Sequence, residues 1–279
     1  MNCHHMGKVT YSKWRLFASV PIAHIFLAFL APDVWSSPPI DDPTGKQPSA
    51  SVPRTVIVQI KGAVTPELTG KVKEALSKTT GDPLPAGLIV FLDSPGGDGL
   101  AAIEIGRLLR DAHAHVFVSG KCSSACVFIF MGGVVRQAKD GALGIHRARI
   151  TRIDPVTKKR IDVDINLNPN AKQRLDEGNQ KIRQYVQDMG VLAQFSAAMD
   201  EVPPDKMRWL TRQEGKNLGI IGFEPSYLRQ RDAYLVERLK NQPGDLERNV
   251  DRVMDHCFDE IEKPKGNFVR CYRLSLNRP

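Results

Sequence analysis

The sequence contains a single extended apolar run, at residues 16–31, and nothing comparable after it. No later stretch reaches the roughly 20 apolar residues that a transmembrane helix needs. The chain also has no Walker A phosphate loop, since the fragment PTGKQ at residues 43–47 lacks the first glycine and the flanking strand of that motif. We therefore expect neither a second membrane span nor an ATPase domain in this chain.

Strong charge of one sign and clusters of metal ligands are missing too. The formal net charge of +8 is modest for 279 residues, and no nucleic-acid-binding motif accompanies it. His113 and His115 are only two residues apart, and no acidic or cysteine partner lies at ligand spacing. We expect no nucleic-acid partner, no metal and no cofactor. The composition, 42% hydrophobic and 25% charged, is that of an ordinary globular protein.

The N-terminus has the pattern of an export signal. Three basic residues, Lys8, Lys13 and Arg15, precede the apolar run, and the small residues up to Ser36 suit cleavage. We predict a signal peptide over residues 1–36 and an exported, periplasmic or otherwise extracytoplasmic protein. The alternative is a retained N-terminal anchor, in which residues 16–31 would attach the protein to the inner membrane.

If the protein is exported, its cysteines are expected to form disulfides, because disulfides persist in oxidising compartments. Four cysteines follow the predicted signal. Cys257 and Cys271 enclose a small loop, and we predict that they pair. Cys122 and Cys126 can pair only if the turn between them bends suitably. Two small buried thiols are the alternative for that pair.

After a Pro-, Ser- and Asp-rich linker at 37–53, apolar runs alternate with amphipathic stretches. Strands are expected at 56–60, 88–92, 115–119 and around 142–146, and helices at 66–79, 100–112, 170–189 and 191–200. A β-hairpin is expected within 147–167. Residues 224–279 are predicted to form a helical extension that ends in a strand-like segment, FVRCYRLSL. The alternation predicts an α/β fold with a mostly parallel sheet.

Two turns and one histidine stand at predicted strand ends. The turn SPGGD occupies 94–98, the turn CSSAC occupies 122–126, and His146 ends the fourth strand. Loops at the carboxyl ends of parallel strands converge on one edge of the sheet, where ligands bind. A serine nucleophile needs a nearby base and two donors for the oxyanion, and glycine-rich turns supply such donors. The spacing makes a serine–histidine site plausible but does not choose between Ser123 and Ser124.

Five segments, in this order, resemble the proteolytic subunit of the Clp protease. They are VIVQIKGAVT, LIVFLDSPGGDG, VFVSGKCSSACVFIFMGG, GALGIH and MRWLTRQEGKNLGIIG. The resemblance covers residues 54–223 and leaves 224–279 without a counterpart. It implies the ClpP/crotonase-like fold of repeated ββα units and a serine peptidase acting on peptide bonds.

Position by position, the resemblance assigns four roles. Ser124 takes the nucleophile's place, and His146 takes that of the base. The backbone amides of Gly97 and Ala125 match the donors of the oxyanion hole. One departure is Cys126, which stands where the family has glycine or alanine, and a Cys122–Cys126 disulfide would clamp the serine's turn.

The third catalytic residue is less clearly matched. The family's aspartate falls near AAMDEVPPDK, where Asp200 is the nearest candidate and Glu201 and Asp205 are weaker ones. A plain Ser124–His146 dyad is the alternative. Related exported peptidases use lysine as the general base. A Ser–Lys dyad with Lys158 or Lys159, which lie in the predicted hairpin, is therefore a further alternative.

These features predict an exported, ATP-independent serine peptidase that cuts extended or unfolded peptides. The resemblance also implies a homo-oligomer, and the N-terminus offers a means of membrane association. The alternative is a catalytically degenerate, ClpP-like protein that binds peptides or acts as a scaffold in the cell envelope, since a fold does not by itself imply a function.

Overall fold

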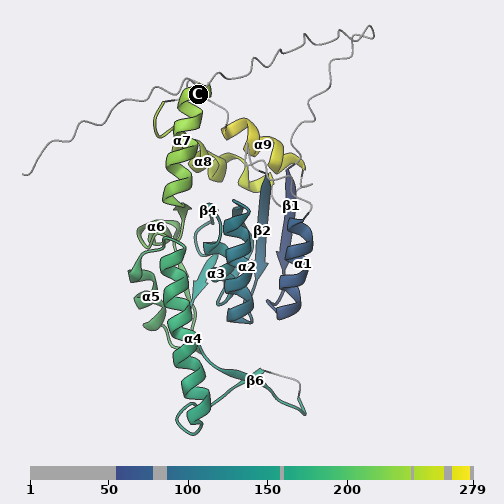
Figure 1. Ribbon diagram of the computed structural model, residues 1–279, viewed down its shortest axis with the longest axis vertical. Coiled ribbons are helices and arrows are strands. Elements are labelled where there is room, and N and C mark those ends of the chain that lie inside the picture. The colour runs from purple at the N-terminus through teal and green to yellow at the C-terminus, as the bar shows by residue number, and fades with distance from the viewer. Residues whose placement is uncertain (1–54, 78–86, 158–159, 240–241, 261–265, 277–279) are drawn as a thin grey trace, which may run out of the picture. The chain divides into compact units, whose positions relative to one another are not determined.

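The computed structural model describes residues 55–77, 87–157, 160–239, 242–260 and 266–276 (Figure 1). The chain divides into two units, residues 1–50 and 51–279, and all described residues belong to the second. The predicted signal, the whole of the predicted linker, and the lysines at 158 and 159 lie outside the described ranges. Among the described residues, no helix has the length and apolarity needed to cross a membrane.

Strands and helices alternate through the first half of the described chain, as predicted. The strands are β1 (Val56–Lys61), β2 (Leu88–Ser94), β3 (His115–Ser123), β4 (Val135–Gln137), β5 (Leu143–Ile145), β6 (Thr151–Ile153), β7 (Arg160–Asp162), β8 (Arg208–Leu210) and β9 (Gly222–Phe223). The helices are α1 (Pro66–Leu76), α2 (Gly99–Asp111), α3 (Cys126–Met131), α4 (Pro169–Asp188), α5 (Ala193–Asp200), α6 (Arg212–Asn217), α7 (Pro225–Leu239), α8 (Asp245–His256), the short 3₁₀ helix Phe258–Glu260 and α9 (Gly266–Leu276).

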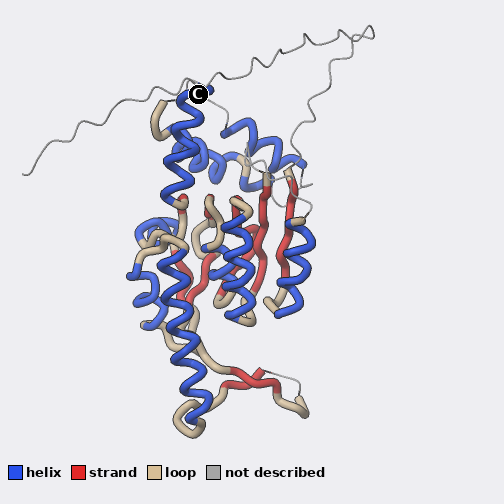
Figure 2. Tube along the Cα trace, viewed as in Figure 1, coloured by secondary structure: helices blue, strands red, loops and turns tan. Residues whose placement is uncertain are grey.

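The main sheet is mostly parallel, which confirms the predicted fold class. β1, β2, β3 and β4 pair in that order and all in parallel, and β9 joins β4 antiparallel. The far end of β3 pairs in parallel with β5 instead, and β8 continues from β5 antiparallel. The strands lie side by side behind the helices in Figure 2. β6 and β7 form the predicted antiparallel hairpin.

Helices cover both faces of the sheet, and alternate side chains of a strand point toward opposite faces, so one strand contributes to two cores. In β2, Val90 and Leu92 join a core made with α1, α2, α3 and α4, whereas Phe91 joins a second core made with α8 and α9. Phe91 lies 5.1 Å, ring centre to ring centre, from Phe268 of α9. The continuous apolar run of β2 therefore follows from helices on both sides of the sheet.

One predicted element is wrong. The segment FVRCYRLSL, expected as a strand, lies within the helix α9. Phe268, Tyr272 and Leu276 are all buried in the second core, and their four-residue spacing places them on one helical face. The β-branched and aromatic content suggested a strand, but the packing of this stripe against the sheet determines a helix.

Candidate active site

The two turns singled out in the sequence meet at the carboxyl ends of β2 and β3. Ser94 of β2 lies opposite Cys122 of β3 in the parallel register, so the residues that follow each strand are neighbours. Gly96 touches the turn at Ser124: a Cβ on Gly96 would lie 2.8 Å from the Cβ of Ser124 and 2.8 Å from the amide nitrogen of Ala125. Only glycine fits there, and the φ of +89° at Gly96 adds to that requirement.

The two serines of the second turn have different surroundings. Ser123 is buried in β3, where it pairs with Gly144. Ser124 is half-buried, has a φ of +56° and lines a cavity of about 390 Å³. Left-handed backbone is uncommon for a residue with a side chain, and such outliers gather at functional sites. The backbone thus presents Ser124, and not Ser123, to the cavity.

Two backbone amides near Ser124 have no acceptor among the described residues. The carbonyl of Gly96 accepts from the amide of Val64, and the amide of Asp98 donates to the carbonyl of Val64. Among the described residues, neither the amide of Gly97, which lies between them, nor that of Ala125 donates to a protein atom. Both residues line the cavity, and amides without a protein acceptor are the kind of donor that an oxyanion needs.

His146 lines the same cavity as Ser124. Its Nδ1 lies 2.8 Å from the carbonyl oxygen of Arg147. A carbonyl oxygen only accepts, so Nδ1 carries the proton and Nε2 keeps its lone pair. Burial lowers the pKa of His146 because it disfavours the charged imidazolium, and the Arg147 carbonyl partly opposes that change. The imidazole is therefore neutral and able to accept a proton near neutral pH.

Asp200, the candidate third residue, lies at the end of α5 and pairs with another partner. Its Oδ2 accepts from the guanidinium of Arg183 at 3.0 Å, and the pair is exposed. The Nδ1 position that a catalytic aspartate would occupy is taken by the Arg147 carbonyl. Sequence patterns could not reveal this acceptor, because every residue carries a backbone carbonyl.

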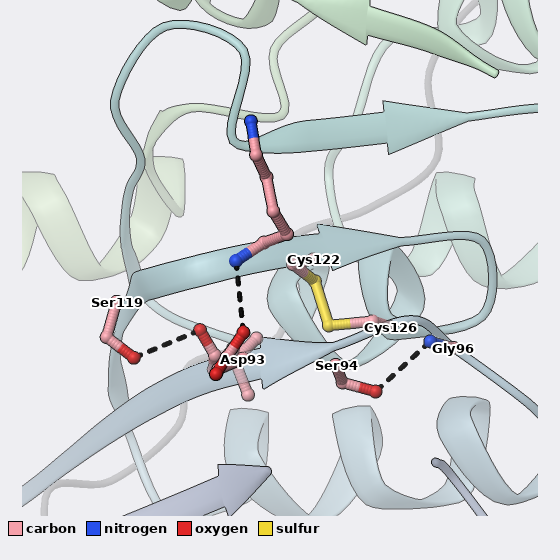
Figure 3. The surroundings of a disulfide bond; sticks show 8 residues. Asp93, Ser94, Gly96, Ser119, Cys122 and Cys126 are labelled. Carbon is pink, nitrogen blue, oxygen red and sulfur yellow. Dashed lines mark hydrogen bonds between the residues drawn. A yellow bond between two sulfur atoms is a disulfide. The ribbon is translucent and has the colours of Figure 1, made fainter. Parts of the chain in front are cut away.

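A disulfide joins the two residues that flank this turn. Cys122 and Cys126 are bonded, with Cα atoms 5.3 Å apart (Figure 3). Ser124 is the middle residue of the five that run from Cys122 to Cys126. The amide of Gly96 donates to Ser94 Oγ at 3.1 Å, which fixes the facing turn. Cys257 and Cys271 are bonded as well, so the predicted second pair is confirmed. Both bonds are compatible with an extracytoplasmic location.

Nothing in the described ranges resembles a metal centre: they contain no group of three or more His, Cys, Asp or Glu side chains placed to hold an ion. The polar groups at the cavity include the hydroxyl of Ser124, the imidazole of His146 and the backbone amides of Gly97 and Ala125, and the side chains of Arg149 and Thr151 line it as well. A hydroxyl, an imidazole and two amides are the inventory for attack on a carbonyl.

No family model and no curated protein matches the sequence. Solved structures similar to it include a ClpP1 mutant from Listeria monocytogenes, with 19% identity, a TM-score of 0.45, and coverage of 60% of this chain and 88% of that one. Two mutants of the 1510-N membrane-bound stomatin-specific protease are similar too. One has 18% identity, a TM-score of 0.45, and coverage of 63% and 83%. The other, in complex with a substrate peptide, has 18% identity, a TM-score of 0.43, and coverage of 61% and 75%. At these identities each likeness concerns the fold alone.

Proposed function

We propose that this protein is a serine peptidase in which Ser124 is the nucleophile and His146 is the general base. The observation that carries the proposal is the left-handed backbone of Ser124 in a cavity that His146 also lines. A left-handed turn that brings a serine into the same cavity as a neutral histidine, with two amides that have no protein acceptor, supplies the groups that acyl transfer requires.

The mechanism follows from these groups. Ser124 Oγ attacks the carbonyl carbon of a peptide bond while Nε2 of His146 takes the hydroxyl proton. The negative charge that forms on the carbonyl oxygen is stabilised by the amides of Gly97 and Ala125. His146 then gives its proton to the leaving amine, and water, activated in the same way, hydrolyses the acyl-enzyme.

The contact of Nδ1 with the Arg147 carbonyl supports a dyad rather than a triad with Asp200. A carbonyl fixes the tautomer and orientation of the imidazole but gives less electrostatic help to the imidazolium than a carboxylate would. If the dyad is correct, Asp200→Asn lowers kcat by less than about tenfold, whereas loss of a triad aspartate costs roughly 10⁴-fold.

The proposal also covers the location of the enzyme, its substrates and its assembly. The N-terminal signal pattern and the two disulfides support an exported enzyme that works without ATP on extended or unfolded chains. A homo-oligomer is the assembly that we propose.

The test is hydrolysis of an unstructured, fluorescently quenched polypeptide by the full-length protein, with and without ATP. We expect ATP-independent cleavage that Ser123→Ala retains and Ser124→Ala and His146→Ala lose. Cleavage by Ser124→Ala at the wild-type rate would contradict the assignment. Binding without any cleavage by the wild type would favour the second candidate, a peptide-binding protein that has kept the cavity without the chemistry.

A further inference from the structure

A second cavity of about 430 Å³ opens beside the one that holds Ser124 and His146. The two cavities share part of their walls, including Gly97, Ala148 and Arg149. The second is bounded by the start of α2, by the chain that enters the hairpin and by the middle of α4. A peptide extending from the reaction centre in this direction would place a side chain here within a few residues, since an extended chain advances about 3.3 Å per residue.

The wall of this second cavity is mainly basic. Four basic side chains line it, Arg149, Arg152, Arg174 and Lys181, against the acidic side chains of Asp98 and Glu177. Both carboxylates accept hydrogen bonds within the protein. Asp98 caps α2 by accepting from the amide of Ala101, and Glu177 accepts from the side-chain amide of Gln173. Arg149 pairs with Asp162.

Arg174 and Lys181 form no ion pair with any residue in the described part of the chain. They are seven residues apart on α4, which is two helical turns, so both project toward the same side. Gly178 lies between them and lines the cavity, and a Cβ added there would meet nothing within 4 Å. The surface between the two cations is therefore open to a ligand group.

We infer that this second cavity is a substrate subsite that selects a carboxylate, and that Arg174 and Lys181 are its specificity-determining residues. The inference rests on the proposed peptidase function. In a peptide the carboxylate comes either from a Glu or Asp side chain or from the free C-terminus. Arginine binds carboxylates through paired, charge-assisted hydrogen bonds, and lysine adds a point charge.

The experiment uses pairs of fluorescently quenched peptides that are identical except for one position, which is Glu in one peptide and Gln in the other. A separate pair is made for each position on either side of the cleaved bond. With full-length protein we expect kcat/KM at one position to favour Glu by about tenfold, and added salt to reduce that ratio. Peptides with a free or amidated C-terminus distinguish the two sources of the carboxylate.

Matched variants test the residues. In Arg174→Gln/Lys181→Gln, the ratio of kcat/KM for the Glu peptide to that for the Gln peptide should be close to one. Arg174→Lys, which keeps Lys181, should have a ratio between that of the double variant and that of the wild type. The control Lys71→Gln/Lys172→Gln removes the same charge from surfaces outside the cavity and should keep the wild-type ratio. A wild type without Glu preference, or a ratio unchanged in the cavity variant, would overturn the inference.

Failure of the peptidase function gives a separate result, namely no cleavage of any peptide and no labelling of Ser124 by a fluorophosphonate. In that case, fluorescence anisotropy of the same peptides on the full-length protein tests the subsite. Tighter binding of the Glu peptide that Arg174→Gln/Lys181→Gln abolishes would support the subsite by itself, and equal binding of both peptides would overturn it.

Discussion

Gly96 is the residue that brings the two turns of the site together, because its missing side chain allows the contact with Ser124. Gly96→Ala would place a Cβ 2.8 Å from the Ser124 Cβ in a left-handed conformation that costs roughly 1–2 kcal/mol for other residues. We expect fluorophosphonate labelling of Ser124 to slow by about a hundredfold or more, because small displacements of reacting groups are costly. Gly70→Ala, in α1 with nothing within 4 Å of the added Cβ, is the control and should label normally.

As the proposed general base, His146 should determine how the rate of labelling falls at acidic pH. A histidine acts as a base only when neutral, and burial lowers the pKa of His146 below its usual 6.5. The rate of labelling should therefore be constant through neutral pH and fall only at acidic values, with an apparent pKa below 6.5. The measurement is the second-order labelling rate between pH 4 and pH 9, and an apparent pKa above 6.5 would contradict the account.

At the residue scale, sequence alone could place the serine and histidine near one another but not choose between Ser123 and Ser124. The choice between them rests on the resemblance, and the position of Ser124 at the wall of the cavity, where Ser123 does not lie, agrees with it. The assignment of the Gly97 and Ala125 amides as oxyanion donors also rests on the resemblance, and it stays a prediction. The contact of His146 with the Arg147 carbonyl and the ion pair of Asp200 depend on the tertiary path of the chain, so no local pattern revealed them.

At the scale of elements, the turn between β3 and α3 is closed by its own disulfide. Removing it with Cys122→Ala/Cys126→Ala should lower the free energy of unfolding by about 2 kcal/mol and slow labelling of Ser124 by about tenfold, since the turn loses its constraint. The urea midpoint and the labelling rate are measured together.

The other disulfide provides the comparison. Cys257→Ala/Cys271→Ala should cost about 3 kcal/mol of stability because its loop is longer, yet leave labelling of the folded protein unchanged. Equal effects of the two double variants on labelling would show that the first disulfide has only a general stabilising role.

Most helices and strands that carry the site follow strong local patterns, and their predicted bounds nearly match. The exception is β3, which was expected at 115–119 and continues to Ser123. α4 was expected over 170–189 and spans Pro169–Asp188, with Asn168 as a side-chain cap. The short strands β4, β8 and β9 escaped prediction because two or three residues give too little periodicity. The error in α9 shows that residue preference for strands yields to a buried stripe at helical spacing.

At the scale of the whole described unit, residues far apart in the sequence are joined at a buried histidine. His115 of β3 contacts the hydroxyl of Tyr272 in α9 through Nδ1, at 2.5 Å, and that of Tyr227 in α7 through Nε2, at 2.7 Å. Burial lowers the pKa of His115 to about 3, so the folded protein keeps it neutral. The neutral histidine therefore ties the C-terminal helices to the sheet, and charging it in this buried position costs free energy.

This contact predicts a pH dependence of stability. Between the ordinary pKa of 6.5 and about 3, the unfolded chain binds a proton at His115 that the folded chain does not, so stability falls as the pH falls. Between pH 6.5 and pH 5 the wild type should lose roughly 1–2 kcal/mol more than His115→Gln, which cannot titrate. Urea unfolding at the two pH values measures this, and equal losses would contradict it.

The most direct test of the central claim is mass spectrometry of the protein after reaction with a fluorophosphonate. The account predicts one adduct per chain, located on Ser124, in the wild type and in Ser123→Ala. It predicts no adduct in Ser124→Ala and a much slower reaction in His146→Ala. An adduct that forms on Ser124→Ala at the wild-type rate, or a folded wild type that forms none, would contradict the assignment of Ser124 as a nucleophile.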